Sequence, residues 1–345
     1  MQNKRPVIIL TTLFLSSFAI IGLLAFLSRN IIDKKNGFTR RLLPAILQPR
    51  NRQTFPSTIY RISGSRAGKV YLQGNNPYTV YTTTLSLDSL TSISLDIPPE
   101  KRLNSGTRHF LYGRHLYISC RSLPGIIDYD LDAQKTSNHI LPYYYTKEAC
   151  ISNDQFILRA NDRKTKDPLF VRINLNTPTA RQEDHFSEKT GTSIFPTDGI
   201  LYFDTTTHLA CYTYFYQNGF ICMDSNLNLI VKGKTIDTIT KREIKIARVG
   251  SSLTMKQPPQ FVNDLGTVAN GKLFLQSMLK ADNELPLDFA ENTVIDAYSV
   301  TNGNYIASFY IPPYKGNKPY QFHIIGKMLY AIYGKTVVEY NLPAI

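Results

Sequence analysis

The sequence has 345 residues, of which 43% are hydrophobic, 12% aromatic and 19% charged. This composition is typical of a globular protein and excludes a wholly disordered, collagen-like or mucin-like chain. The formal net charge of +13 would by itself favour a nucleic-acid partner. However, residues 1–54 contain nine Lys and Arg against one acid, which leaves only +5 for the remainder. The charge distribution therefore predicts no nucleic-acid binding.

The first predicted element is an apolar helix from Val7 to Leu27, preceded by a short basic tail, residues 1–6. No residue in this stretch is charged, and at about 1.5 Å rise per residue it spans roughly 30 Å, enough for the hydrocarbon core of a bilayer. A cleaved signal peptide is the alternative, with an apolar core of about 7–15 residues before a small-x-small site. Large residues precede Ser28 where small ones would be needed, so we favour an uncleaved single-pass anchor.

The sequence indicates less directly on which side of the membrane the residues after this helix lie. The excess of Lys and Arg after the helix would keep the C-terminal part in the cytoplasm under the positive-inside rule. A short basic leader before an N-terminal apolar segment is instead the layout of a signal anchor, and long domains translocate largely regardless of charge. We therefore expect the rest of the chain on the extracytoplasmic, periplasmic side.

Residues 28–54 are predicted to form a basic juxtamembrane linker before a folded domain at 55–345. This linker is either a solvated spacer or a segment that contacts anionic lipid headgroups, at about 1 kcal/mol per basic residue close to the surface. The residues that would make this contact are Arg29, Lys34, Lys35, Arg40 and Arg41.

The body of the chain repeats one pattern, a turn that often contains Gly followed by a short strand with aliphatic and Tyr residues. Asn-Gly, Asp-Gly and Gly-x turns supply the positive φ that tight hairpins need. The six turns lie near positions 68, 113, 154, 199, 271 and 326, at spacings of 45, 41, 45, 72 and 55 residues. Four strands in 40–50 residues is the size of a propeller blade. The sequence thus predicts an all-β, six-bladed propeller, with insertions or a hidden seventh blade in the 72-residue interval.

The last repeat has room for only three strands before the chain ends at Ile345. A strand from the start of the domain, Ser57 to Ile62, is expected to complete it and so close the ring. Over residues 57–343 these repeats resemble six-bladed propellers of the TolB-like type. The resemblance implies an extracytoplasmic binding module and carries no enzyme's site residues.

Signatures of catalysis are absent or incomplete. There is no Gly-x-Ser-x-Gly, and Gly334-Lys335-Thr336 lacks the earlier Gly of a phosphate-binding loop and is better explained as a hairpin turn. The six His form no metal-ligand motif, although a propeller can gather His from separate blades. We expect no cofactor and no resident metal. The alternative is a propeller hydrolase or lyase with a metal at the mouth of its channel.

The four Cys, at positions 120, 150, 211 and 222, are even in number, as in disulfide-bonded exported proteins. If Asn218-Gly219 is a two-residue turn, Cys211 and Cys222 lie roughly 13 Å apart along the ladder, too far to bridge. We therefore expect four free Cys, or at most a bridge between Cys120 and Cys150.

Basic residues follow the turn Gly in four of the six repeats, namely Lys69, Arg114, Lys272 and Lys327. Equivalent positions in a radial repeat form a ring on one face, so these residues are candidates for binding an anionic ligand; alternatively, they are ordinary polar turn residues in water. The overall prediction is a membrane-anchored extracytoplasmic propeller that acts as a non-enzymatic binding or scaffold module for a protein, peptide or glycan. Its exposed loops would carry the recognition.

Overall fold

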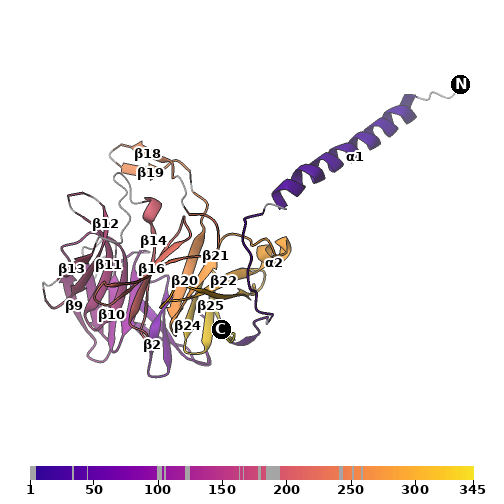
Figure 1. Ribbon diagram of the computed structural model, residues 1–345. Coiled ribbons are helices and arrows are strands. Elements are labelled where there is room, and N and C mark those ends of the chain that lie inside the picture. Colours follow the sequence, from indigo (N-terminus) through magenta and orange to yellow (C-terminus); the bar gives the residue numbers. More distant parts are fainter. Residues whose placement is uncertain are drawn as a thin grey trace.

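The structure is a computed structural model, in which an isolated helix precedes a ring of β-sheets (Figure 1). It describes residues 5–32, 35–44, 46–98, 103–104, 106–120, 125–162, 164–165, 167–177, 180–183, 195–240, 244–250, 252–257 and 259–345.

Helix α1 (Arg5–Ile32) projects away from the ring, and none of its span Val7–Phe26 is buried (Figure 1). The mean hydropathy of this span is 2.5, and its length suffices to cross a bilayer. A signal sequence near the N-terminus has the same properties, so the helix marks the chain for secretion or membrane anchoring.

The ring contains six antiparallel four-stranded sheets, so the predicted six-bladed propeller is confirmed. Blade 1 contains β2 (Ile59–Arg66), β3 (Lys69–Gly74), β4 (Thr79–Thr84) and β5 (Thr91–Ser94). Blade 2 contains β6 (Arg108–Tyr112), β7 (His115–Ser119), β8 (Gly125–Asp130) and β9 (Lys135–Ile140). Blade 3 contains β10 (Tyr145–Ser152), β11 (Gln155–Asn161), β12 (Pro168–Asn174) and β13 (Ala180–Glu183).

The second half of the ring follows the same plan. Blade 4 contains β14 (Gly199–Asp204), β15 (Leu209–Tyr214), β16 (Gly219–Asp224) and β17 (Leu229–Lys234), preceded by the short 3-10 helix η2 (Phe195–Thr197). Blade 5 contains β20 (Asn263–Ala269), β21 (Lys272–Ser277), β22 (Thr293–Ser299) and β23 (Tyr305–Ile311), with helix α2 (Pro286–Glu291) between its second and third strands. Blade 6 contains β24 (Gln321–Ile325), β25 (Met328–Tyr333), β26 (Thr336–Asn341) and β1 (Pro49–Thr54).

The closing strand differs from the predicted one. Strand β1, Pro49–Thr54, pairs with β26 as the outer strand of blade 6, so the prediction of Ser57 to Ile62 was wrong. Residues 59–62 instead begin β2, the innermost strand of blade 1. The end of the segment expected to be linker is therefore part of the ring.

The inner strands of the six blades are β2, β6, β10, β14, β20 and β24, and each turns directly into the second strand. We call the end of the ring with these turns the turn face, and the opposite end the connection face. Positive φ angles at Gly68, Gly113, Asp154, Gly271 and Gly326 confirm five of the predicted turns. In blade 4 the prediction was one strand early. Gly199 begins the inner strand, and the equivalent turn lies at residues 205–208.

The long interval before blade 5 holds an insertion. Among its described residues, two strands pair with each other alone, β18 (Ile246–Val249) and β19 (Ser252–Met255). They form a hairpin that projects from the connection face (Figure 1). The ring therefore has no seventh blade among the described residues.

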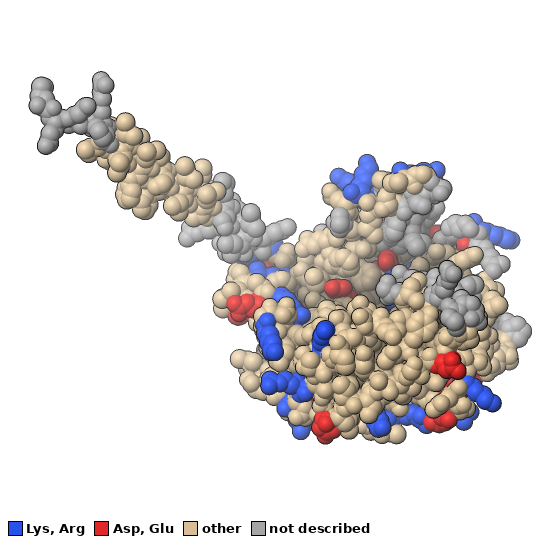
Figure 2. Space-filling view, turned by 180° about the vertical axis from the view of Figure 1, so that it is seen from behind, with Lys and Arg blue, Asp and Glu red and all other residues tan. Residues whose placement is uncertain are grey.

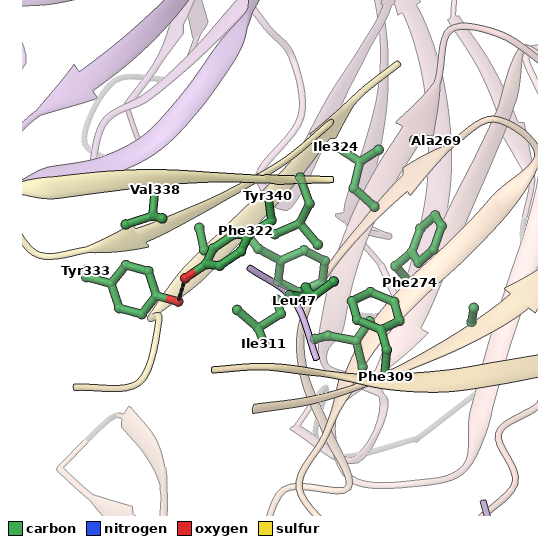
Figure 3. Packing of buried hydrophobic residues seen from close by; sticks show 14 residues of the cluster. Leu47, Ala269, Phe274, Phe309, Ile311, Phe322, Ile324, Tyr333, Val338 and Tyr340 are labelled. Atoms are coloured by element: carbon green, nitrogen blue, oxygen red, sulfur yellow. Dashed lines mark hydrogen bonds between the residues drawn. The ribbon is translucent and has the colours of Figure 1, made fainter. Parts of the chain in front are cut away.

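Aromatic and aliphatic side chains fill the wedges between blades, which explains the many Tyr and Phe residues. Figure 3 shows one such wedge, where Phe274 and Phe309 of blade 5 meet Phe322 of blade 6. The hydroxyls of Tyr333 and Tyr340 lie 3.0 Å apart at its edge (Figure 3). Full burial of one such side chain contributes about 1.5–3 kcal/mol.

Cys211 and Cys222 form a disulfide, so the prediction that they lie too far apart was wrong. The register pairs Cys211 directly with Cys222, with their Cα atoms 4.2 Å apart. The connection between β15 and β16 is four residues long, because Phe215 and Tyr216 turn out of the ladder to pack on Phe261. Cys120 and Cys150 are free, so the four-free-Cys expectation also fails.

Residues 35–44 and 46–48, which we call the tether segment, lie on blade 5 before the chain reaches β1. The backbone N–H of Asn36 donates to Asp282 Oδ1 at 2.7 Å, on the connection between β21 and β22. Phe38 is buried in a small cluster at the connection face, and Leu42 pairs with Ser308 of β23. This segment is docked on the ring instead of being a solvated spacer.

Arg40 is the polar centre of this docking. Its guanidinium pairs with Glu284 and, at 2.8 Å through Nε, with Asp296, and the residue is 4% exposed. The expected lipid contact of Arg40 is therefore contradicted, because its charge is neutralised inside the protein. Lys35 and Arg41 are exposed, whereas the side chains of Arg29 and Lys34 lie outside the described residues.

Candidate binding site in the central channel

The inner strands of all six blades surround a cavity of about 310 Å³ on the ring axis. We call it the channel cavity. Two glycines of the inner strands allow neighbouring strands to pack closely around it. At Gly64 a Cβ atom would lie 3.0 Å from the Cβ of Leu111, and at Gly266 it would lie 2.5 Å from the carbonyl oxygen of Phe274. The cavity volume matches the lower end of small-molecule sites.

Arg61 is the main charged group of this wall. It belongs to β2, and its guanidinium lies over the ring of Phe110, 4.8 Å from the ring centroid. Among the described residues no carboxylate lies within ion-pair distance of Arg61, and its buried Nε has no hydrogen-bond partner. Burial and the nearby charge of Arg108 lower the pKa of Arg61 to about 10, so it is still cationic at neutral pH.

The carboxylate of Glu148 does not form an ion pair with Arg61, because it pairs with Arg108 instead. Glu148 of β10 lies 3.8 Å from Arg108 at the start of β6, and it is buried. Its charge acts on Arg61 only as a weaker, longer-range attraction than the opposing effects of burial and of Arg108. Arg61 therefore has no direct carboxylate partner, although the wall also contains Asp204, whose carboxylate accepts hydrogen bonds from the backbone N–H groups of Thr206 and Gly271.

Three further buried polar atoms in the channel wall have no hydrogen-bond partner within the described chain. They are Ser63 Oγ, Tyr202 Oη and Gln321 Oε1. Buried polar atoms in folded proteins are nearly always bonded, to protein or to a bound molecule. Burial raises the pKa of Tyr202 well above its usual value, so its hydroxyl keeps its proton and can donate. Arg61, Ser63 Oγ and Tyr202 Oη can donate to a ligand that accepts hydrogen bonds, whereas Gln321 Oε1 can only accept one.

His323 of β24 adds a neutral group to the same wall. Its Nδ1 lies 3.3 Å from Thr267 Oγ1. Burial, with a smaller contribution from the Arg61 charge, lowers the pKa of His323 to about 4. At neutral pH this ring is therefore uncharged and can donate or accept one hydrogen bond.

The four cations predicted from the repeats lie at turns on one end of the ring, the turn face. Lys69, Arg114 and Lys327 are exposed and Lys272 is half-buried. Arg114 pairs with Asp130 at 3.0 Å. None of the four is among the residues that line the channel cavity, although each follows a lining residue by one to four positions. The structure thus places them around the mouth of the channel, and their role in ligand binding stays a prediction.

The residues that line the cavity were missed by the sequence analysis. Arg61 was assigned to an outer closing strand, and His323 was noted only as one of six unclustered histidines. The one local signal for this site is a cation, Arg61, within an inner strand. It can be recognised only when β2 is correctly assigned as the inner strand of blade 1. For the alternative metal site, the described residues contain no group of three or more His, Cys, Asp or Glu arranged to hold an ion.

Comparisons with known proteins support the fold. No protein-family model and no curated protein matches the chain. The chain is similar to the crystal structure of a member of the DUF4221 family from Bacteroides vulgatus, at 13% identity and a TM-score of 0.52, over 86% of this chain and 97% of the other.

Two further likenesses are weaker. A chain of the nidogen/laminin complex has 11% identity and a TM-score of 0.44, over 77% of this chain and 84% of its own. The luciferin-regenerating enzyme has 8% identity and a TM-score of 0.44, over 86% and 95%. These two likenesses carry no argument, and the similarity to the DUF4221 member shows a shared fold alone.

Proposed function

We propose that this protein is a membrane-anchored extracytoplasmic propeller that binds an anionic group in its channel cavity. The ligand is a small carboxylate or phosphate, or the acidic end of a peptide or glycan. The observation that carries this proposal is Arg61, a cation held in the channel without a carboxylate partner. A bound anion would balance this charge and bond to Ser63 and Tyr202.

Two other features support the extracytoplasmic location. The disulfide between Cys211 and Cys222 suits an oxidising compartment. The TolB-like resemblance of the repeats implies a binding module outside the cytoplasm. The apolar helix α1 supplies either export or a permanent anchor.

The ligand class can be tested by isothermal titration calorimetry with inorganic phosphate, citrate, galacturonate and a short acidic peptide. We expect at least one of these probes to bind the full-length protein in detergent and to bind Arg61→Gln at least about tenfold more weakly, since a charge-assisted hydrogen bond contributes about 1.5–3 kcal/mol. Binding that is equal in both proteins, or absent from the wild type for every probe, would contradict the proposal.

The matched control is the quadruple variant K69Q/R114Q/K272Q/K327Q, which removes the cations of the turn face and leaves the cavity wall intact. The proposal predicts binding within about threefold of wild type in this variant, because exposed charges act weakly through solvent. If the quadruple variant loses binding while Arg61→Gln retains it, the ring of turn cations is the anion site instead.

A further inference from the structure

The tether segment fixes which face of the ring lies nearest the membrane. Asn36 is hydrogen-bonded to Asp282, and Thr238 Oγ1 donates to the carbonyl of Asn36, both on connections of the connection face. Helix α1 ends at Ile32, four residues earlier. Four residues extend at most about 14 Å. The apolar span ends at Phe26, six helical residues before Ile32, so the hydrocarbon core that contains it lies within about 23 Å of the point where the tether meets the connection face.

Outside α1, six described large apolar side chains are more than half exposed, and all but Ile46 of the tether segment (75%) lie on this same face. Those on this face are Ile140 (84%), Tyr144 (81%), Val249 (68%), Leu285 (66%) and Leu287 (65%). They come from three separate connections, between blades 2 and 3, in the hairpin before blade 5, and around α2. The turn face has no such set among the described residues: Ile46, three residues before β1, stands alone at 75%, and Leu229 reaches 45%.

The hairpin adds positive charge to this apolar set. Lys245, Arg248 and Lys256 are exposed on or beside β18 and β19, next to Val249 at the tip. Figure 2 shows Lys and Arg side chains on this projection. Helix α2 carries Asp288 and Glu291 instead. Attraction to anionic headgroups would therefore act at the hairpin, while α2 offers only apolar contact.

We propose that the connection face lies on the bilayer surface, with Tyr144, Val249 and Leu287 in the headgroup region and the hairpin cations on anionic lipids. This inference rests on the proposed anchoring role of α1. It turns one end of the channel towards the membrane and leaves the turn face, with Lys69 and its equivalents, open to the surrounding solution. The anionic ligand would then enter the channel from the turn face.

The absence of Trp from the sequence provides a direct test. Single-Trp variants of the full-length protein, reconstituted into vesicles rich in phosphatidylserine, report contact with lipid by a blue shift and by quenching with brominated acyl chains. We expect Val249→Trp and Leu287→Trp to lose at least about half their emission in brominated vesicles, as residues that penetrate the interface do. Leu85→Trp on the turn face is the matched control and should be unaffected.

Phe18→Trp, in α1, separates the two proposals. If Phe18→Trp is quenched but Val249→Trp and Leu287→Trp are not, the anchor is sound and the docking of this face is overturned; the face would then be free for a protein partner. If Phe18→Trp is not quenched, the anchoring role itself fails. The variant K245Q/R248Q/K256Q in the Val249→Trp background should reduce quenching at least about twofold at low salt, and equal quenching would contradict the headgroup contact.

Discussion

At the scale of single residues, Arg40 joins the tether segment to the ring. Burial alone would lower its pKa, but the carboxylates of Asp296 and Glu284 hold the pKa of Arg40 above its usual value. The two carboxylates are also bonded by neighbours, Asp296 by Ser308 Oγ at 2.5 Å and Glu284 by Tyr310 Oη at 2.6 Å. One cation is thus shared by two buried carboxylates, and hydrogen bonds from Ser308 and Tyr310 supplement it.

Removal of Arg40 should be severe. We expect Arg40→Met to lower the free energy of unfolding by about 3–5 kcal/mol, because two buried carboxylates lose their cation. Arg52→Gln, at an exposed position of β1, should change it by less than about 0.5 kcal/mol. Urea unfolding of the full-length protein in detergent measures both. An Arg40→Met protein as stable as wild type would show that the network does not hold the tether.

The buried histidines predict a loss of stability in acid. Burial, and secondarily the charge of Arg61, lower the pKa of His109 to about 3 and that of His323 to about 4. The unfolded chain takes up these protons near pH 6.5, whereas the folded protein excludes them. The stability that each neutral histidine contributes is therefore complete above about pH 6.5 and is lost as the pH falls towards 4.

Between about pH 7 and pH 5 this loss should reach about 1–2 kcal/mol for each histidine. His323→Gln should reduce the decline, while His208→Gln, at an exposed position, should leave it unchanged. Urea midpoints at the two pH values provide the measurement. An identical decline in wild type and His323→Gln would show that this ring does not stay neutral in the folded protein.

At the scale of elements, ring closure depends on β1. After Pro49 its residues, Arg50 to Thr54, are all polar, and the whole strand is exposed or half-buried. It nevertheless pairs with β26, and Asn51 Nδ2 donates to Glu339 at 2.7 Å. Without β1, the edge of β26 would present unpaired backbone groups, which is a route to aggregation.

Fragments of three lengths separate closure from tethering. We expect a fragment of residues 35–345 to be monomeric with a urea midpoint close to that of the full-length protein. The fragment 49–345 keeps β1 and should be monomeric but less stable, since it lacks the Arg40 network. The fragment 55–345 should aggregate or unfold at lower urea, because its sixth blade is open. Size-exclusion chromatography and unfolding curves would decide, and equal behaviour of 49–345 and 55–345 would refute closure by β1.

The same elements show how far the sequence predicts the fold. Blade number followed from turns, because a positive φ at Gly or Asn is a local requirement that the sequence displays directly. The closing strand could not be predicted from the sequence, because β1 has no alternation of apolar and polar residues to distinguish it from a linker. The Cys211–Cys222 pairing depended on the length of one connection, and packing of Phe215 and Tyr216 set that length. The role of Arg61 could not be predicted, because its one local signal depends on the register of blade 1 and six inner strands far apart in the sequence create the channel.

At the scale of the whole molecule, the way the ring is held at the membrane depends on whether helix α1 stays attached to the tether segment. Helix α1 is fully exposed over Val7–Phe26, whereas the tether that follows it is fixed to blade 5. If α1 stays attached, the ring is held at the bilayer through both the helix and the connection face. If α1 is removed as a signal sequence, the ring keeps its closing strand and becomes a freely diffusing protein.

The anchored arrangement predicts that the protein stays in the membrane pellet after an alkaline carbonate wash and that its intact mass includes residues 1–32. The span Val7–Leu27 has no charged residue, so removal of this helix from the hydrocarbon core is unfavourable. The matched control is the fragment 35–345 exported behind a cleavable signal, which should appear in the soluble fraction after the same wash. Protease added to spheroplasts, in which the periplasm is open to the medium, should degrade the ring, as expected for a domain outside the cytoplasm. A soluble product whose N-terminus lies after Leu27 would contradict the anchor, while leaving the anion site of the channel open to its own test.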